Sequence, residues 1–160
     1  MNFEFATATR IVFGAGAISQ TGANVKNFGR RALVVTGSNP QRAEKLLANL
    51  ATAGVSTIIF PVCGEPEILT VENGVALAKA EQCDFVIGFG GGSVIDAGKA
   101  IAAMLTNEGE LLDYLEIIGR GKTLLKRSTP FVAIPTTAGT GAEVTRNAVL
   151  ASPEHKAKVS

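Results

Sequence analysis

Short apolar runs alternate with segments of helical spacing along most of the chain, and this alternation strongly restricts the possible folds. The apolar runs lie at residues 33–36, 55–62, 83–90 and 129–135, and the helical segments lie at residues 41–54, 70–82 and 93–107. Continuous apolar strands joined through helices are typical of parallel sheets, because right-handed crossovers place the helices on both faces. We therefore predict an α/β domain over residues 1–160, with peripheral β-hairpins at residues 3–16 and 149–160.

The composition supports a folded domain and argues against several classes of partner. Of the 160 residues, 46% are hydrophobic and 18% are charged, which allows a sizeable core and argues against disorder. The net charge is only +1, so we expect no nucleic-acid partner. No apolar run approaches the roughly 20 residues that span a bilayer, and the first residues lack the layout of a secretory signal. We therefore expect a cytoplasmic protein without a membrane partner.

The residue types that most often bind metals are sparse. Cys63 and Cys83 form neither a CxxC pair nor a dense framework, so we expect two reduced and partly buried thiols. The single histidine, His155, follows Ser-Pro-Glu and is expected in an exposed turn, and one histidine cannot build a multi-histidine metal site. We expect Asp96 and Glu143 to start a helix or to brace a loop, and not to act as general bases.

Three adjacent glycines, Gly90, Gly91 and Gly92, separate an apolar run from a helical segment that opens at Ser93. The N-terminus of such a helix presents free backbone N–H groups and about half a positive charge, which together favour an anion. Glycine lets the backbone approach a pyrophosphate closely and permits positive φ angles, and Ser93 adds a hydroxyl donor. The alternative interpretation is a tight structural turn without a ligand.

Two better-known phosphate motifs do not fit this turn. The dinucleotide pattern GxGxxG, started at Gly88, requires a third glycine at the position of Ser93. The P-loop pattern fails because Ala100 stands after Lys99, where serine or threonine is required. The sequence therefore disfavours a kinase or an ATPase.

A second loop, Pro135–Glu143, follows the last apolar run and has the sequence PTTAGTGAE. Its three threonines stand among small residues. Both this loop and the glycine turn are expected at the carboxyl edge of the sheet, where ligands bind in open α/β folds. We therefore predict that the two loops border one crevice, with ordinary turn chemistry as the alternative.

Together, the segments GGGSVIDAGKA and IPTTAGTGAEVT closely resemble the iron-containing (group III) alcohol dehydrogenase family. The resemblance covers essentially the whole chain and implies a Rossmann-like parallel sheet that binds NAD or NADP. In that family a larger all-helical C-terminal domain follows, and it is absent from this sequence. Because the final KAKVS looks like the start of a strand, we expect the chain to be a piece of a longer protein.

The resemblance also implies roles for residues of both loops and of the C-terminal segment. Gly91–Ser93 are implied to hold the pyrophosphate. Thr136, Thr137 and Thr140 are implied to lie along the phosphates and the nicotinamide side. Lys158 matches a family lysine near the nicotinamide ribose.

The coenzyme preference is inferred from the turn after the first strand. NAD-preferring members of the family carry an aspartate there, which accepts hydrogen bonds from the ribose 2′-OH and repels a 2′-phosphate. Gly37 stands at that place in this sequence, and Ser38, Asn39 and Arg42 add donors for a phosphate. We therefore favour NADP, with NAD as the alternative, because Gly37 also suits a plain turn.

The activity implied by the resemblance is hydride transfer between an alcohol or aldehyde and NAD(P), in a homo-oligomer when the protein is full length. The family binds Fe(II) or Zn through one aspartate and three histidines of its C-terminal half. We therefore expect neither metal ligands nor catalytic residues in this chain, and little or no activity from it alone. Two alternatives stay open, namely a dehydroquinate-synthase-like lyase that uses NAD and a non-catalytic nucleotide-binding module.

Overall fold

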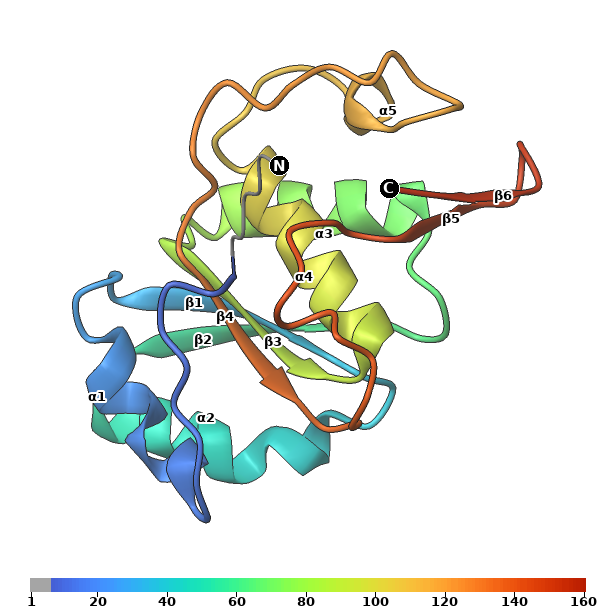
Figure 1. Cartoon of the computed structure of the whole chain (residues 1–160). Helices are drawn as coiled ribbons and strands as arrows, with labels where there is room; N and C mark the ends of the chain where they lie inside the picture. The colour runs from blue at the N-terminus through green and yellow to red at the C-terminus, as the bar shows by residue number, and fades with distance from the viewer. Residues whose placement is uncertain (1–6) are drawn as a thin grey trace, which may run out of the picture.

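A four-stranded parallel sheet lies at the centre of the computed structural model, which describes residues 7–160 (Figure 1). The strands are β1 (Arg31–Thr36), β2 (Ser56–Pro61), β3 (Phe85–Gly90) and β4 (Phe131–Pro135), in the spatial order β2-β1-β3-β4. The helices are η1 (Ala17–Gln20), α1 (Thr21–Val25), η2 (Pro40–Ala43), α2 (Glu44–Thr52), α3 (Ile68–Ala80), α4 (Gly92–Met104) and α5 (Leu111–Tyr114), of which η1 and η2 are 3-10 helices. An antiparallel pair, β5 (Leu150–Ser152) and β6 (Ala157–Val159), forms a second, separate sheet. The predicted alternation of strands and helices is confirmed.

Helices cover both faces of the central sheet, because both sets of alternate side chains along its strands are apolar. In β1, Leu33 and Val35 belong to the core cluster that also contains residues of α3 and α4. Ala32 and Val34 point the other way and pack in a second cluster with residues of α1 and α2. Figure 1 shows the same division, with α3 and α4 above the sheet and α1 and α2 below it. The predicted fold class, a Rossmann-like parallel sheet with helices on both faces, is confirmed.

Helix α4 packs closely on the sheet because glycines stand where it crosses β3. A Cβ atom on Gly98 of α4 would lie 2.7 Å from ring carbon Cε2 of Phe131 in β4 and 3.6 Å from the Cα atom of Gly88 in β3. No side chain fits at this crossing, since protein interiors are close-packed. The crossing therefore fixes the depth at which α4 lies, and with it the position of the helix N-terminus.

One of the two expected hairpins is present and the other is not. Strands β5 and β6 form the antiparallel pair predicted for residues 149–160. Residues 7–16 contain no strand, so the hairpin predicted at residues 3–16 is wrong over this range, while residues 3–6 lie outside the described residues. Phe13 is 99% exposed. The apolar side chains of this segment therefore do not pack against the rest of the protein. A two-stranded hairpin without such packing is only marginally stable.

Neither Cys63 nor Cys83 forms a disulfide. Cys63 is exposed, contrary to the prediction of a partly buried thiol, because it stands in the loop after β2 and not in the strand. Cys83 is half-buried as predicted, and burial raises the pKa of its thiol. His155 is exposed in the turn between β5 and β6, with its Nδ1 atom 2.8 Å from the hydroxyl of Ser152, so the prediction of an exposed turn is confirmed.

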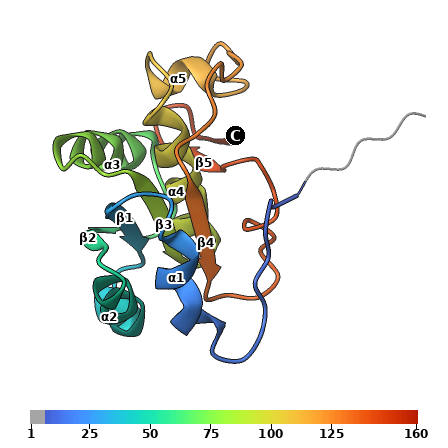
Figure 2. The same cartoon turned by 90° about the vertical axis from the view of Figure 1, so that its left-hand side faces the viewer.

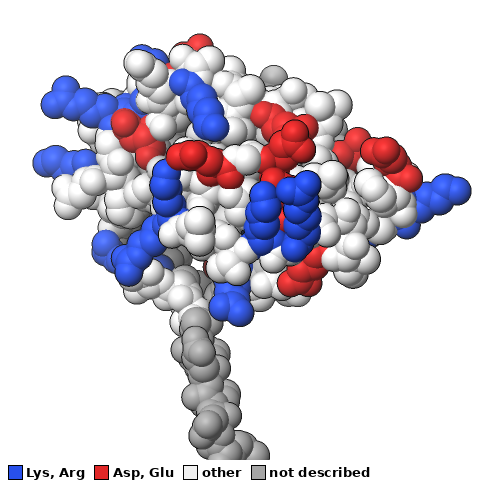
Figure 3. Space-filling view, turned by 90° about the horizontal axis from the view of Figure 1, so that it is seen from above, with Lys and Arg blue, Asp and Glu red and all other residues white. Residues whose placement is uncertain are grey.

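Positive and negative side chains stand side by side on the face that carries α5 (Figure 3). Asp113 of α5 lies 2.7 Å from the ammonium group of Lys122 and 3.4 Å from the guanidinium group of Arg120. The hydrogen bond from Lys122 lowers the pKa of the Asp113 carboxyl. Lys126 and Glu108 form a further pair at 2.9 Å. This face therefore presents interspersed charges and not a continuous field of one sign.

Candidate functional site

The direction in which the chain winds through the sheet reverses between the neighbouring strands β1 and β3. From β1 the chain crosses to β2 on one side, and β3 and β4 then follow on the other side. In open parallel sheets, ligands bind outside the carboxyl ends of the strands at such a switch point. Thr36 of β1 is level with Phe89 of β3, and Gly90 of β3 is level with Pro135 of β4. The three loops that carry most of the predicted site residues therefore begin side by side at one edge.

The turn after β3 carries three backbone N–H groups without a hydrogen-bond acceptor in the described part of the chain, those of Gly91, Gly92 and Ser93. Helix α4 begins at Gly92, and its first helical hydrogen bond runs from the Ile95 N–H to the Gly91 carbonyl at 3.1 Å. The three residues with free N–H groups are all partly exposed. With the dipole of the 13-residue helix α4 behind them, these donors form a site suited to an anion.

Packing, and not backbone conformation, requires glycine at the start of this turn. A Cβ atom on Gly90 would lie 2.6 Å from the Cβ atom of Val94. Val94 is only 4% exposed, and its branched side chain has little freedom to move away. None of the glycines in this turn has a positive φ angle. The prediction that they permit positive φ angles is therefore wrong. The backbone at Gly90 instead packs directly against the side chain of Val94 in the first turn of α4.

The threonine loop lies against the glycine turn, as the sequence predicts. A Cβ atom on Gly91 would lie 3.2 Å from the Thr137 hydroxyl oxygen, and one on Gly92 would lie 3.4 Å from the Cβ atom of Thr140. The Thr136 N–H donates to the last carbonyl of β3 at 2.8 Å, which continues the pairing of β3 and β4 into the loop. All three threonines are exposed. Backbone donors and threonine hydroxyls therefore border the same space.

Beyond Thr137 the loop has no regular structure, and Figure 2 shows the connection from β4 to β5 running outside the layer of the sheet. Gly139 and Gly141 have φ angles of +87° and +69°, in the left-handed region that favours glycine. The Thr140 hydroxyl makes a long contact of 3.5 Å with the Glu143 carboxylate. This contact agrees with the predicted bracing role of Glu143.

The turn after β1 is open and polar. A Cβ atom on Gly37 would meet no other atom within 4 Å. Ser38 and Asn39 are exposed, and the Asn39 side chain accepts a hydrogen bond from the Gln41 N–H at 3.2 Å, so that it caps η2. Arg42 is also exposed. The space beside the carboxyl end of β1 is thus free of neighbouring side chains, and the turn itself contributes no carboxylate.

Lys158 is not brought together with the other predicted residues by any contact in the described part of the chain. It lies on β6, and its ammonium nitrogen is 2.5 Å from a carboxylate oxygen of Glu65 in the loop between β2 and α3. The hairpin is joined to the same loop by a hydrogen bond from the Ala151 N–H to the Pro66 carbonyl at 2.9 Å. The structure thus pairs Lys158 with a loop that carries none of the other predicted residues.

Sequence reasoning missed Lys99, which links α4 to the chain beyond the threonine loop. Its ammonium nitrogen lies 2.9 Å from the Asp96 carboxylate and 3.3 Å from the Thr145 carbonyl oxygen, and it also contacts the Asn147 carbonyl. Asp96 stands in the second turn of α4, so it does not start the helix as predicted, and it acts on a loop only through Lys99. The spacing of Asp96 and Lys99 in the sequence was a usable signal for this pair. The carbonyl groups of Thr145 and Asn147 left no signal in the sequence, because they lie more than forty residues from Lys99.

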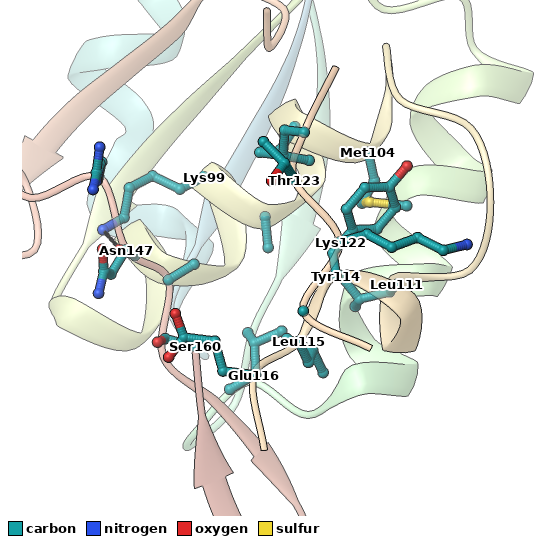
Figure 4. Close-up of a pocket in the computed structure, with 17 residues that line it drawn as sticks. Lys99, Met104, Leu111, Tyr114, Leu115, Glu116, Lys122, Thr123, Asn147 and Ser160 are labelled. Carbon is teal, nitrogen blue, oxygen red and sulfur yellow. Dashed lines mark hydrogen bonds between the residues drawn. The ribbon is translucent and has the colours of Figure 1, made fainter. Parts of the chain in front are cut away.

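A cavity of about 380 Å³ lies beside the C-terminal half of α4 (Figure 4). Its apolar lining includes Met104, Leu111 and Leu115, and its lining also includes Lys99 and Asn147. No residue of the glycine turn, of the turn after β1 or of the threonine loop lines it. The cavity is therefore separate from the sheet edge described above.

The described residues contain no group of three or more His, Cys, Asp or Glu side chains that is arranged to hold a metal ion. A catalytic iron or zinc ion of the kind implied by the resemblance therefore does not fit the residues of this part of the chain. Within residues 7–160, none of the helices combines the length and the apolar character needed to cross a bilayer.

Comparison with known proteins agrees with the motifs and the fold. The family model described as iron-containing alcohol dehydrogenase matches residues 8–160. The chain belongs to the iron-containing alcohol dehydrogenase family. The resemblance carried by the glycine turn and the threonine loop is thus confirmed over nearly the whole sequence.

Relatives within the iron-containing alcohol dehydrogenases are considerably longer than this chain. Choline dehydrogenase of Bacillus subtilis is 39% identical over 159 residues, which are 96% of this chain and 39% of the relative. The crystal structure of a 1,3-propanediol oxidoreductase has a TM-score of 0.91 at 37% identity and covers 99% of this chain and 42% of that chain. Sulfoacetaldehyde reductase of Bifidobacterium kashiwanohense, solved in complex with NAD+, has a TM-score of 0.87 at 29% identity, with 99% and 42% coverage. The chain therefore spans about two fifths of the length of the relatives it matches.

Proposed function

We propose that this chain forms the coenzyme-binding part of an NAD(P)-dependent alcohol dehydrogenase, an oxidoreductase that transfers hydride between an alcohol or aldehyde and the coenzyme. The observation that carries the proposal is the turn after β3. There, three N–H groups lack partners among the described residues, and threonine hydroxyls border the same space. Membership of the iron-containing alcohol dehydrogenase family supports the same activity, and one relative has been solved with NAD+.

Each group of predicted site residues has a distinct role in the proposed complex. The N–H groups of Gly91–Ser93 donate to the pyrophosphate, since the missing Cβ atoms let its oxygens approach the backbone. Thr136, Thr137 and Thr140 add hydroxyl donors along the phosphates and toward the nicotinamide. Lys158 is proposed to serve the nicotinamide ribose, with Glu65 as its partner when no coenzyme is present. The bound nicotinamide ring supplies the carbon that accepts or donates hydride.

We favour NADP over NAD as the coenzyme of this chain, with NAD as the alternative. The open turn after β1 supports the choice, because Gly37 leaves room beside the strand end and Ser38 and Asn39 are exposed. A 2′-phosphate placed there meets polar donors and no carboxylate of the turn. The relative solved with NAD+ shows that the family includes NAD-binding enzymes, so the preference rests on this turn alone.

The remaining parts of the activity are proposed to lie outside the described residues. These residues do not fit a metal site, so the ligands for Fe(II) or Zn and the pocket for a small alcohol or aldehyde belong to a longer protein of the kind the relatives represent. For that protein we propose a homo-oligomer in the cytoplasm. The chain alone is expected to bind coenzyme without turning over alcohol. The lyase alternative is set aside, because the chain belongs to the alcohol dehydrogenase family.

A negative charge placed in the glycine turn tests the proposed coenzyme site. Gly92 is the first residue of α4, and a Cβ atom there would make only an ordinary contact with Thr140, at 3.4 Å. Gly92→Asp adds a carboxylate that a helix N-terminus tolerates, so the free energy of unfolding should change by less than about 1 kcal/mol. The affinity for NADPH and NADH, measured by calorimetry, should fall by about tenfold or more, because like charges repel.

Gly92→Asn is the matched control, since it has nearly the same shape without the charge. We expect it to bind either coenzyme much more tightly than Gly92→Asp does. A folded Gly92→Asp variant with the affinity of the wild type would show that the diphosphate does not lie at this turn. Failure of the wild-type chain to bind either coenzyme would overturn the proposed function as well.

A further inference from the structure

We propose that Asp96 and Lys99 form a positioning pair that holds the threonine loop against the glycine turn. This inference rests on the proposed function, because its consequence is a change in coenzyme affinity. Neither side chain belongs to the turn or loop residues that are proposed to contact the coenzyme. The pair is therefore assigned an indirect role, through the loop that it anchors.

The ammonium group of Lys99 joins α4 to a segment more than forty residues further along the chain. It contacts the carbonyl oxygen and the hydroxyl of Thr145, at 3.3 Å and 3.4 Å, and the carbonyl oxygen of Asn147. The Asp96 carboxylate lies 2.9 Å away and neutralises its charge. Figure 4 shows the Lys99 side chain extending from α4 toward Asn147.

The segment from Thr136 to Asn147, which contains most of the threonine loop, is thereby attached to the glycine turn and its helix at both ends. At one end the Thr136 N–H is bonded to the last carbonyl of β3, at 2.8 Å. At the other end Lys99 holds Thr145 and Asn147. The residues between these attachments have no regular structure. The two attachments therefore decide how close the loop stays to Gly91 and Gly92.

An ordinary ion pair between neighbouring helical turns does not account for these contacts. Such pairs are solvent-exposed and contribute little, because water screens both charges. Here the side chains of Lys99 and Asp96 are only 12% and 14% exposed. A charge so far removed from water requires partners, and Lys99 obtains most of them from the loop and not from its own helix.

Removal of the ammonium group tests the role of the pair. Lys99→Met keeps an unbranched side chain but removes every hydrogen bond that the ammonium group makes with Thr145 and Asn147. We expect the amide hydrogen of Val144, which donates to the Gly141 carbonyl at 3.1 Å, to exchange about tenfold faster or more without coenzyme, while the buried centre of α4 keeps its protection. We expect the affinity for NADPH to fall by about three- to tenfold, which lies within the roughly two- to thirtyfold range found for coupling through a linking residue.

The double variant Asp96→Asn/Lys99→Met separates a lost attachment from an unpaired charge. If the weaker binding of Lys99→Met came only from the unpaired carboxylate, the double variant would regain wild-type affinity, and the proposal would be overturned. If the attachment matters, the double variant stays weak. A role in stability alone would lower the midpoint of unfolding without changing the coenzyme dissociation constant of the folded protein.

The outcomes for the two proposals are distinguishable. Wild-type binding together with unchanged affinity in Lys99→Met overturns the positioning role and leaves the proposed function intact. Absence of coenzyme binding by the wild type overturns the proposed function. Exchange of the hydrogen-bonded Val144 amide that is unchanged in Lys99→Met shows, without any coenzyme, that Lys99 does not hold this segment.

Discussion

The turns after β1 and β3 start at the same sheet edge from neighbouring strands, yet they are built in opposite ways. After β3, a Cβ atom on Gly90 would lie 2.6 Å from Val94, whereas after β1 a Cβ atom on Gly37 would meet nothing within 4 Å. The turn after β3 is enclosed and offers backbone donors. The turn after β1 is open and offers the exposed side chains of Ser38 and Asn39.

This difference matches the parts of the coenzyme that each turn is proposed to bind. The diphosphate is common to NAD and NADP, and a site made of backbone donors binds it without the cost of ordering side chains. The 2′ position distinguishes the two coenzymes, and an open loop of polar side chains can change its preference without disturbing the core. A side chain added at the closely packed Gly90 should therefore reduce stability and affinity together, whereas substitutions after β1 should change coenzyme preference.

The largest effect is expected for Gly90→Ala. The added methyl group collides with the buried, stiff side chain of Val94, and overpacking of this kind costs about 1–3 kcal/mol in the free energy of unfolding. Because Val94 lies in the first turn of α4, the strain also displaces the N–H groups that are proposed to bind the diphosphate. Thermal unfolding and coenzyme titration on the same preparation should show both losses.

Gly37→Ala is the matched control at the open turn. The methyl group meets no atom within 4 Å, and the φ angle of Gly37 is not in the left-handed region. Stability should therefore stay constant or rise by up to about 1 kcal/mol, since alanine restricts the unfolded chain more than glycine does. Equal destabilisation by the two substitutions would contradict the contrast between an enclosed and an open turn.

The fold and the pairing of the two loops could be predicted because local signals agree with the tertiary structure. The apolar runs are continuous, since both faces of the strands are covered, and the glycine turn follows one of them directly. Parallel strands then place their carboxyl ends at one edge, which brings Gly91 near Thr137 without any further information.

Other features depend on contacts that no local pattern contains. The strand order, and with it the switch point between β1 and β3, follows from packing of the whole sheet. The prediction of a hairpin over residues 3–16 was wrong for residues 7–16, where Phe13 is exposed and no surface covers it. The spacing of Asp96 and Lys99 suggests a charged pair. Its contact with Thr145 cannot be predicted from spacing, because that residue lies on a distant segment of the chain.

A smaller effect, confined to selectivity, is expected for Gly37→Asp. The carboxylate accepts hydrogen bonds from a ribose 2′-OH and repels a 2′-phosphate, so the ratio of NADPH to NADH affinity should fall by about tenfold. The open space around Gly37 accommodates the side chain, and stability should stay within about 0.5 kcal/mol of the wild type. Gly37→Asn adds the same bulk without the charge. If Gly37→Asp and Gly37→Asn have the same ratio of NADPH to NADH affinity, the ribose 2′ position of the coenzyme does not lie at this turn.

The smallest effects are expected at Asn39, where one side chain has two proposed roles. Its oxygen caps η2 through the Gln41 N–H, and loss of such a cap in Asn39→Ala should cost about 0.5–1 kcal/mol of stability. Its amide group is proposed to donate to a 2′-phosphate, so Asn39→Ala should also weaken NADPH binding by a few-fold, about the value of one hydrogen bond.

Asn39→Asp keeps the capping oxygen and replaces the donor by a negative charge. It should therefore unfold like the wild type and bind NADPH less tightly than Asn39→Ala does. If Asn39→Asp binds NADPH normally, Asn39 serves only as a helix cap, and Ser38 and Arg42 remain as the donors at the open turn.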